Sequence, residues 1–396
     1  MSGSAVGRAP RGPRLVAPGL VWRRYEWHVL LIGLVLLGVG LVLVHSMSAR
    51  DDLFDRDDIR FEGHIQKVLL TLPFLASGLF VRARWLRRRA FLVYGLTLAG
   101  LVLVELIGEE RNNARRWIPT PIGFDLQPSE FAKIGLIVVL ARVLGQRRPT
   151  SLGDYLKPAL LTLIPMALVV KQPDLGTALT FVPVALGLMY LAGANGRAMA
   201  VICALGLLLG AAAWNWRWVE DYQLRRIDTW AASYTPEDLI AGQNGPAFHV
   251  YHARVAIGNG GWDGTGLGGG VASTAGHLPE RESDSIFCVI AEEAGFVGGS
   301  AFLVLYALMI ALLLGAAARV RERYTRLFVG GVGLYFASHF AVNVGVNLGL
   351  LPMTGLTLPL LSTGGSSMLT SFCALGLALG LAAQEAPSLD EGAFRD

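Results

Sequence analysis

The chain has 396 residues, of which 53% are hydrophobic and 16% charged. This composition, with a mean hydropathy of +0.49, excludes an ordinary soluble domain and indicates a polytopic membrane protein. The formal net charge of +4 reflects arginines at the ends of apolar runs, so it favours a topology signal over nucleic-acid binding. The three cysteines, Cys203, Cys288 and Cys373, lie in separate apolar runs, which predicts neither a disulfide framework nor a metal site.

Ten apolar stretches are long enough, or nearly so, to cross a hydrocarbon core of about 30 Å. They begin near His28, Ile65, Ala90, Ser129, Tyr155, Leu175, Arg197, Asp284, Leu327 and Gly365. We therefore expect an all-α fold with about ten transmembrane helices. The run at 155–170 is short and leaves a re-entrant segment as the alternative, but the polar residues 171–174 favour an aqueous turn. The first run lacks a small-residue cleavage site at its end, so we expect it to remain as a span.

These runs divide the chain into five parts. Residues 1–27 are rich in arginine and proline and are expected to form a disordered cytoplasmic tail. Residues 28–215 hold the first seven helices, residues 216–283 a long extracytoplasmic loop, residues 284–386 the last three helices, and residues 387–396 a cytoplasmic tail. A loop of that length in a compact protein is more often functional than not.

The distribution of arginine predicts the orientation. Residues 1–27 hold five arginines and the connection at 82–89 holds five more. The connections that alternate with these arginine-rich segments are acidic or mixed in charge. Because cytoplasmic loops carry the excess of basic residues, both termini should lie inside and the long loop outside the membrane.

The long loop contains the glycine-rich stretch 258–270. It has no Gly-Lys-Ser/Thr and no preceding strand, so a phosphate cradle for ATP is not expected. We expect glycines in positive-φ turns that pack over the membrane surface. The alternative role is to hold a substrate anion with free backbone N–H groups.

A second polar segment lies between the third and fourth runs. Arg115 and Arg116 are expected on the outer face, against the trend of the other arginines, and the planar guanidinium group suits a phosphate. An interfacial pair beside Trp117 is the alternative. Glu130 and Lys133 lie three residues apart at the start of the fourth helix, so they share a face and can pair. That pair could be structural or part of a site.

The eighth run opens with carboxylates. A charged group within a membrane span costs roughly 2.5–3.5 kcal/mol on insertion scales, so acidic residues here indicate a lined cavity. Asp284, Cys288 and Glu292 recur every four residues, which predicts one helical stripe with Glu292 about 12 Å deeper than Asp284. Partial desolvation would raise the pKa of Asp284 towards that of a useful base, and a nearby Lys133 would lower it again. A helix N-terminal carboxylate is the alternative.

Six motifs occur in order along the chain, and together they carry a family resemblance. They are Arg116-Trp117-Ile, Gln127-Pro-Ser-Glu130-Phe-Ala-Lys133, Gln172-Pro-Asp174-Leu-Gly-Thr177, Ala256-Ile-Gly-Asn-Gly-Gly261, Leu278-Pro-Glu280 with Ser283-Asp284 and Glu292-Glu293, and Asn347-Leu-Gly-Leu-Leu-Pro-Met-Thr-Gly355 with Ser362-Thr-Gly-Gly-Ser-Ser367. This pattern resembles the RodA/FtsW family, the SEDS proteins of shape, elongation, division and sporulation. The match runs from about Arg116 to the last span, and the ten-helix plan fits the rest.

The resemblance implies a peptidoglycan glycosyltransferase of cell elongation or division, which polymerises lipid II with inversion at the donor anomeric carbon and releases undecaprenyl pyrophosphate. It places the essential aspartate of the family on Asp284. The substrate-binding residues that it implies are Arg116, Trp117, Glu130, Lys133, Gln172, Asp174, Glu292 and Ser366.

The same resemblance implies a setting and partners. The chain should lie in the bacterial inner membrane with its active site on the outer face. It should work with a class B penicillin-binding protein and with other membrane proteins of the elongation or division complex, and not with nucleic acid. A divalent cation, Mg or Mn, is expected to assist, with Asp284 as a candidate ligand, and no organic cofactor is expected.

Some residues depart from the family pattern. Thr265 stands where the family commonly has lysine, Thr363 where it has tyrosine, and His252 where glutamine is common. Residues 352–355 look RodA-like and residues 356–359 more FtsW-like, and we favour RodA.

The alternative function is a lipid II flippase or another lipid-linked sugar transporter, and a weaker one is a non-catalytic scaffold. Against a carrier, the polar residues concentrate on the external side and no paired discontinuous segments appear in two halves.

Overall fold

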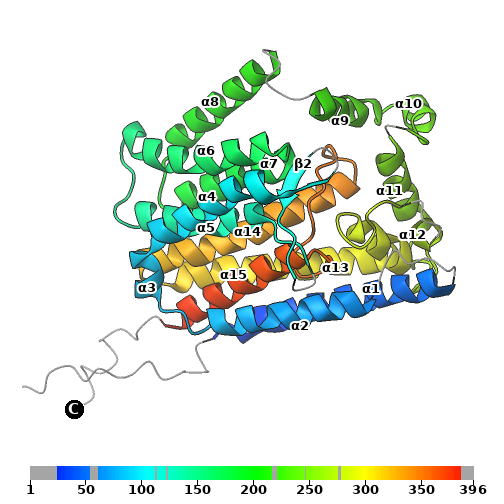
Figure 1. Ribbon diagram of the computed structural model, residues 1–396, viewed down its shortest axis with the longest axis horizontal. Helices are drawn as coiled ribbons and strands as arrows, with labels where there is room; N and C mark the ends of the chain where they lie inside the picture. Colours follow the sequence, from blue (N-terminus) through cyan, green and yellow to red (C-terminus); the bar gives the residue numbers. More distant parts are fainter. Residues whose placement is uncertain are drawn as a thin grey trace, which may run out of the picture.

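The computed structural model describes residues 25–53, 61–111, 114–121, 124–215, 221–245, 247–274 and 278–384. The predicted tail at 1–27, apart from its last three residues, and the tail at 387–396 lie outside these ranges, as does the acidic connection at 54–60. The structure is mostly helical, and its long helices run roughly side by side along the horizontal axis of Figure 1.

Long helices begin within four residues of each of the ten predicted starts. They are α1 (Trp27–Leu53), α2 (Phe61–Gly78), α4 (Ala90–Ile107), α5 (Pro128–Leu144), α6 (Leu156–Lys171), α7 (Leu175–Leu191), α8 (Gly196–Asn215), α13 (Ile286–Arg319), α14 (Arg323–Asn347) and α15 (Gly365–Ala383). In the described chain, six segments are long and apolar enough to cross a membrane: Trp27–Ala49, Ala90–Ile107, Leu152–Lys171, Ile286–Arg319, Arg323–Asn347 and Gly365–Ala383. The chain is therefore a multi-pass membrane protein.

The bundle is organised around α14 and α15, the most buried of the apolar segments. Helix α14 packs against α13, α7 and α5, and α15 packs against α2. The α2–α15 contact depends on glycine, because a Cβ on Gly376 would lie 2.1 Å from the carbonyl oxygen of Leu75. Small residues of this kind let two membrane helices approach backbone to backbone.

Local sequence signals explain several helix ends. Pro128 and Glu130 open α5, where a missing N–H and a negative charge are both favourable. Asp174 caps α7 by accepting a hydrogen bond from the Thr177 N–H at 3.1 Å. Arg323, the first residue of α14, donates to the terminal carbonyls of Leu144 and Ala192, which joins three helix ends.

Shorter elements connect the long helices. Helix α3 (Ala83–Arg88) occupies the arginine-rich connection, and the 3-10 turn η2 (Leu152–Tyr155) precedes α6. Strands β1 (Glu109–Arg111) and β2 (Ala114–Trp117) form an antiparallel hairpin. The fold is mostly helical as expected, and this short hairpin, which carries Arg115 and Arg116 on β2, is a feature that the sequence did not predict.

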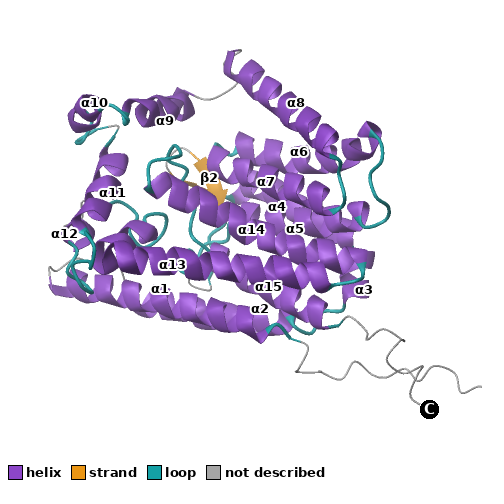
Figure 2. Ribbon diagram, turned by 180° about the vertical axis from the view of Figure 1, so that it is seen from behind, coloured by secondary structure: helices purple, strands orange, loops and turns teal. Residues whose placement is uncertain are grey.

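The predicted long loop contains helices of its own. Helices α9 (Asp221–Ala232), α10 (Pro236–Ala241), α11 (Phe248–Asn259) and α12 (Val271–Thr274) follow α8. They gather at one end of the bundle, on the right in Figure 1 and on the left in the reverse view of Figure 2. The N-terminal end of α13 lies with them, since α11 packs against α13.

Helix α13 is broken at Gly295, whose φ of 66° and ψ of −167° are not helical. The glycine-rich loop enters the break: the N–H groups of Phe296 and Val297 donate to the carbonyls of Gly261 and Trp262. Those loop carbonyls thus replace the helical partners that the break removes.

Asp284 does not belong to the helical stripe that its spacing predicted. The N–H groups of Ser283 and Ser285 both donate to the carbonyl of Glu280, which has a φ of 47°. This tight turn delays the start of α13 to Ile286. Asp284 therefore lies on the turn, before the helix that carries Cys288 and Glu292.

Candidate functional site

The turn that carries Asp284 is fixed from two sides. The side-chain amides of Asn343 and Asn347 both donate to the backbone carbonyl of Asp284, at 2.9 and 2.8 Å. On the other side, the Ser362 hydroxyl donates to the Ser283 carbonyl at 2.5 Å, and the Thr363 N–H donates to the Glu282 carbonyl at 3.0 Å. Because its backbone is held by α14 and by the segment before α15, the carboxyl group has a defined position.

The carboxyl group of Asp284 is almost completely buried, with 7% of the residue exposed. Burial raises its pKa to about 7, and the neighbouring carboxyl groups of Glu280 and Glu282 act in the same direction. A carboxyl group with this pKa is a suitable general base near neutral pH. Lys133, which was expected to lower this pKa, contacts Glu130 and His339.

Lys133 and Glu130 form the ion pair that their spacing predicted. The Lys133 Nζ lies 2.7 Å from Glu130 Oε1, and the two side chains are 0% and 4% exposed. The same Nζ lies 2.7 Å from His339 Nε2 on α14. An ammonium group can only donate, so Nε2 accepts and the Nδ1–H of His339 donates to the Thr357 carbonyl at 3.2 Å.

One stripe of α14 connects this ion pair to Asp284. His339, Asn343 and Asn347 recur every four residues and therefore share a face of the helix. His339 contacts Lys133, while the two asparagines hold Asp284. The sequence interpretation did not identify His339 or Asn343 as site residues, although polar side chains at this spacing in an apolar run were the available signal.

Arg116 on β2 is half-buried and binds the turn between α6 and α7. Its Nε donates to the Gln172 carbonyl at 3.0 Å, and its second guanidinium nitrogen donates to the Pro173 carbonyl. The side chain of Gln172 reaches in turn to the Leu101 carbonyl at 2.8 Å. The structure thus joins Arg116 with Gln172, and Trp117 follows on the same strand.

Asp174 and Ser366 are joined through the residues before α5. The Gln127 side-chain amide contacts Asp174 Oδ2 at 3.4 Å, and the Gln127 backbone N–H donates to the Ser366 hydroxyl at 2.8 Å. Ser366 itself donates to the Asp125 carbonyl at 2.6 Å. Both predicted site residues therefore position the segment that leads to Glu130.

Glu292 lies apart from this group and holds the glycine-rich loop. It has no exposed surface, and its two carboxylate oxygens accept from the N–H groups of Ala272 and Ser273, at 2.8 and 2.9 Å. Asn259 adds a third donor at 3.3 Å. The carboxylate therefore holds the loop in place, and the substrate-binding role of Glu292 stays a prediction.

The glycine-rich loop has the predicted turns, and several of its N–H groups are bound within the fold. The φ angle is positive at Gly261, Gly264, Gly266 and Gly268. The N–H groups of Thr265 and Gly266 donate to the backbone carbonyls of Glu292 and Glu293, and that of Gly268 donates to the Glu293 carboxylate. Thr265, in the place of the family lysine, also donates its hydroxyl to the Glu292 carbonyl at 3.1 Å. This loop is a structural wedge in α13.

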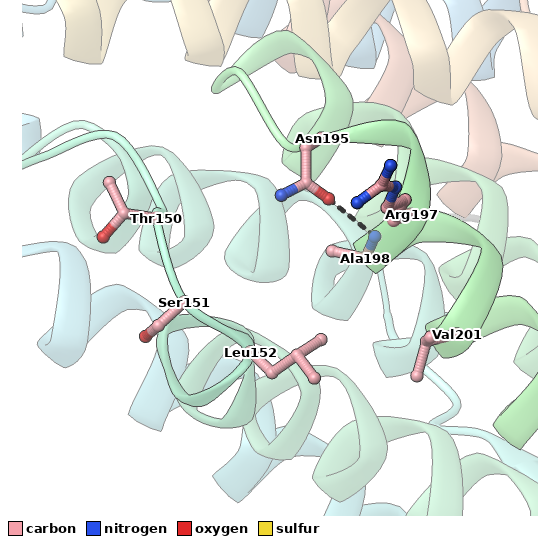
Figure 3. A pocket seen from close by; sticks show the side chains of 7 residues that line it. All are labelled: Thr150, Ser151, Leu152, Asn195, Arg197, Ala198 and Val201. Carbon is pink, nitrogen blue, oxygen red and sulfur yellow. Dashed lines mark hydrogen bonds between the residues drawn. The ribbon is translucent and has the colours of Figure 1, made fainter.

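A pocket at the other end of the bundle is not part of this site (Figure 3). It is lined by Thr150, Ser151, Leu152, Asn195, Arg197, Ala198 and Val201. Arg323 contacts the helix ends beside this pocket, whereas Asn347 holds Asp284. Helix α14 runs from Arg323 to Asn347, and these two ends are about 36 Å apart at a rise of about 1.5 Å per residue.

Within the described part of the chain, no three or more His, Cys, Asp and Glu side chains are grouped so as to hold a metal ion.

The sequence and the structure were compared with known proteins. A family model described as cell cycle protein, which groups FtsW, RodA and SpoVE, matches residues 27–386. A probable peptidoglycan glycosyltransferase FtsW of Halorhodospira halophila is 34% identical to this chain over an alignment 407 residues long. The alignment covers 99% of this chain and 98% of the relative. The protein of the same name from Halomonas elongata is 36% identical over 299 residues, 73% of this chain and 72% of the relative.

Two solved structures have the same fold. One is a chain from a peptidoglycan synthase complex that coordinates polymerization and crosslinking; it has a TM-score of 0.76 and 31% identity, with 91% of this chain and 98% of that chain covered. The other is the rod shape determining protein RodA of Thermus thermophilus, with a TM-score of 0.68, 29% identity, and 93% and 99% coverage. The chain therefore belongs to the FtsW, RodA and SpoVE family of cell cycle proteins.

Proposed function

We propose that this chain is a peptidoglycan glycosyltransferase that polymerises lipid II into glycan strands. The observation that carries the proposal is Asp284, a buried carboxyl group with a pKa raised to about 7. It lies on a fixed turn in a chain that is 34% identical over nearly its full length to a probable peptidoglycan glycosyltransferase. The chain is similar to relatives of both the FtsW and the RodA type, and we propose the RodA type.

In the proposed reaction, Asp284 accepts the proton of the acceptor sugar 4-hydroxyl. The hydroxyl oxygen attacks the anomeric carbon of the donor and forms the new glycosidic bond with inversion, while the bond to pyrophosphate breaks. Undecaprenyl pyrophosphate leaves with that bond's electron pair. A base with a pKa near the working pH is suited to this proton transfer.

Negative charge develops on the departing pyrophosphate, and cations placed in advance can stabilise it. Arg116 is half-buried, and its guanidinium binds two backbone carbonyls that phosphate oxygens can replace. Lys133 has no exposed side-chain surface, so we assign it a longer-range electrostatic role. Glu130 and His339 fix its position. A divalent cation, Mg or Mn, remains part of the proposal as an addition to be tested.

The proposed topology has ten spans with both termini in the cytoplasm and Asp284 at the outer face of the inner membrane. It is supported by the arginines in the connection at 82–89 and by the collection of α9 to α12 at the opposite end of the bundle. The tails of two polyprenyl substrates could then stay in the lipid while their head groups reach the turn at Asp284.

We further propose a class B penicillin-binding protein as the partner that cross-links the new strands, together with other proteins of the elongation or division complex. Support comes from the fold similarity to a chain of a peptidoglycan synthase complex.

The test is glycan synthesis by the purified chain with its penicillin-binding partner, the partner made inactive in both polymerisation and cross-linking. Labelled lipid II is added with Mg or Mn, and wild type is compared with Asp284→Asn on a gel. Glycan from wild type that is lost in Asp284→Asn is the expected result. No glycan from either, with movement of lipid II across vesicles, would instead establish the flippase alternative.

A further inference from the structure

His249 on α11 lies beside the Asp284 carboxyl group. Its Nε2 lies 4.0 Å from Asp284 Oδ1 and 3.1 Å from the hydroxyl oxygen of Ser285. The His249 side chain is 18% exposed and the Asp284 side chain 9%. The contact therefore forms in a largely water-free environment, where a hydrogen bond to a charged group is strong.

The contacts of Ser285 define which nitrogen of His249 carries the proton. The Ser285 hydroxyl has one hydrogen, and it lies 2.9 Å from the Pro279 carbonyl, which can only accept. When the Ser285 hydroxyl donates that hydrogen to the Pro279 carbonyl, its oxygen can accept a hydrogen bond from His249. Both contacts are hydrogen bonds only when the proton of His249 is on Nε2, the nitrogen that faces Asp284.

The charges around this group keep His249 a neutral donor. Burial lowers its pKa to about 4, and Arg226 from α9 and His252 from α11 act in the same direction. On the side of Asp284, Glu280 and Glu282 are acidic, and the groups from α14 are the amides of Asn343 and Asn347, which bind the backbone. The single Nε2–H of His249 is donated to Ser285 in this structure, and the Asp284 carboxyl oxygen lies 4.0 Å from the same nitrogen.

We propose that His249 is a positioning residue of the transfer reaction: its Nε2–H is donated to Ser285 in this structure and moves to the Asp284 carboxylate, which it orients, when that group is ionised. The inference rests on the proposed function, because it concerns the same base. Helix α11, which lies in the connection between α8 and α13, would then act directly on the Asp284 carboxylate through His249. A shift of about 1 Å brings the 4.0 Å contact into hydrogen-bond range.

The experiment measures kcat and KM for lipid II with the purified full-length chain and its inactivated partner. His249→Phe keeps the ring and removes the donor, and we expect kcat to fall about 10- to 100-fold, the effect of losing a hydrogen bond to a charged group. KM should change little, because the lost contact is to Asp284 and not to substrate. His249→Gln restores an N–H near the position of Nε2 and should return kcat to within about threefold of wild type.

His252→Phe is the matched control, because His252 lies on the same helix and its ring packs against Phe248 and Tyr251. It should keep kcat within about twofold of wild type. If His249→Phe fails to fold in a thermal unfolding assay, His249→Leu provides the same loss of the donor.

The outcomes separate this inference from the function on which it rests. Equal kcat in wild type and His249→Phe, or a His249→Gln variant as slow as His249→Phe, would overturn the positioning role and leave the glycosyltransferase proposal standing. Absence of glycan from wild type itself would overturn both.

Discussion

Lys133 and Glu130 form an ion pair with no water contact at the lysine, with 2.7 Å between Nζ and Oε1 on the first turns of α5. Removal of one partner from such a pair leaves a buried charge uncompensated and costs about 3–5 kcal/mol. We expect Lys133→Ala to lower the free energy of unfolding by that amount, measured by thermal unfolding in detergent. Polymerisation should be lost as well.

The double variant Glu130→Gln with Lys133→Met separates stability from function, since replacing both charges by groups of similar size is often nearly neutral for stability. Recovered stability without glycan synthesis would support an electrostatic role of Lys133. Full recovery of synthesis would show that the pair is only structural.

Asp51 and Arg281 form a second buried pair, which joins the end of α1 to the turn of Asp284. One Arg281 nitrogen contacts both Asp51 oxygens, at 2.5 and 2.6 Å, with side-chain exposures of 5% and 1%. We expect Asp51→Ala to cost about 3–5 kcal/mol of stability and to lower kcat, because Arg281 precedes Asp284 by three residues.

Glu26→Ala is the control for that prediction. Glu26 pairs with Arg319 at 2.8 Å, but the two side chains are 27% and 60% exposed, so the loss should not exceed about 1 kcal/mol. The stability of both variants is measured by thermal unfolding, and their activity is measured by glycan synthesis. Equal effects would argue against an anchoring role for the Asp51–Arg281 pair.

The helix plan could be predicted from the sequence because the thickness of the bilayer sets the length of each apolar run. The Lys133–Glu130 contact could be predicted too, because a separation of three residues on one helix fixes the geometry. Each of these features depends on local spacing, which the sequence displays directly.

Features that depend on tertiary contacts could not be predicted in the same way. Gly295 lies within the longest helical segment, and the break there depends on a distant loop that supplies hydrogen-bond acceptors to Phe296 and Val297. Asp284 has helical spacing to Glu292, yet the turn at Glu280 keeps it out of the helix. The approach of His249 to Asp284 likewise joins two segments whose packing no local pattern records.

Gly264 should be intolerant of a side chain. Its φ is 81°, and an added Cβ would lie 2.1 Å from the Glu293 carbonyl oxygen inside the break of α13. We expect Gly264→Ala to cost at least about 1–3 kcal/mol, the range for a residue forced into such a backbone region, and to reduce glycan synthesis.

Gly258→Ala is the control: a Cβ there meets no atom within 4 Å, and alanine in helix α11 should leave stability unchanged or raise it by up to about 1 kcal/mol. Thermal unfolding of both variants tests this prediction, and equal stability of the two would contradict it.

The raised pKa of Asp284 predicts opposite effects of pH on activity and stability. The ionised fraction of Asp284, which is the form that acts as a base, increases as pH rises through about 7. Glycan synthesis should therefore rise between pH 6 and pH 8. The folded-state pKa lies above the usual value of 3.8, so the folded state binds the proton more tightly than the unfolded chain. The associated stabilisation is complete below pH 3.8 and is lost as pH rises through about 7. Wild type should therefore lose thermal stability relative to Asp284→Asn from pH 4 to pH 7, and Asp284→Asn should be the more stable protein at pH 8. Parallel stability curves for the two proteins would show that the pKa of Asp284 is not raised.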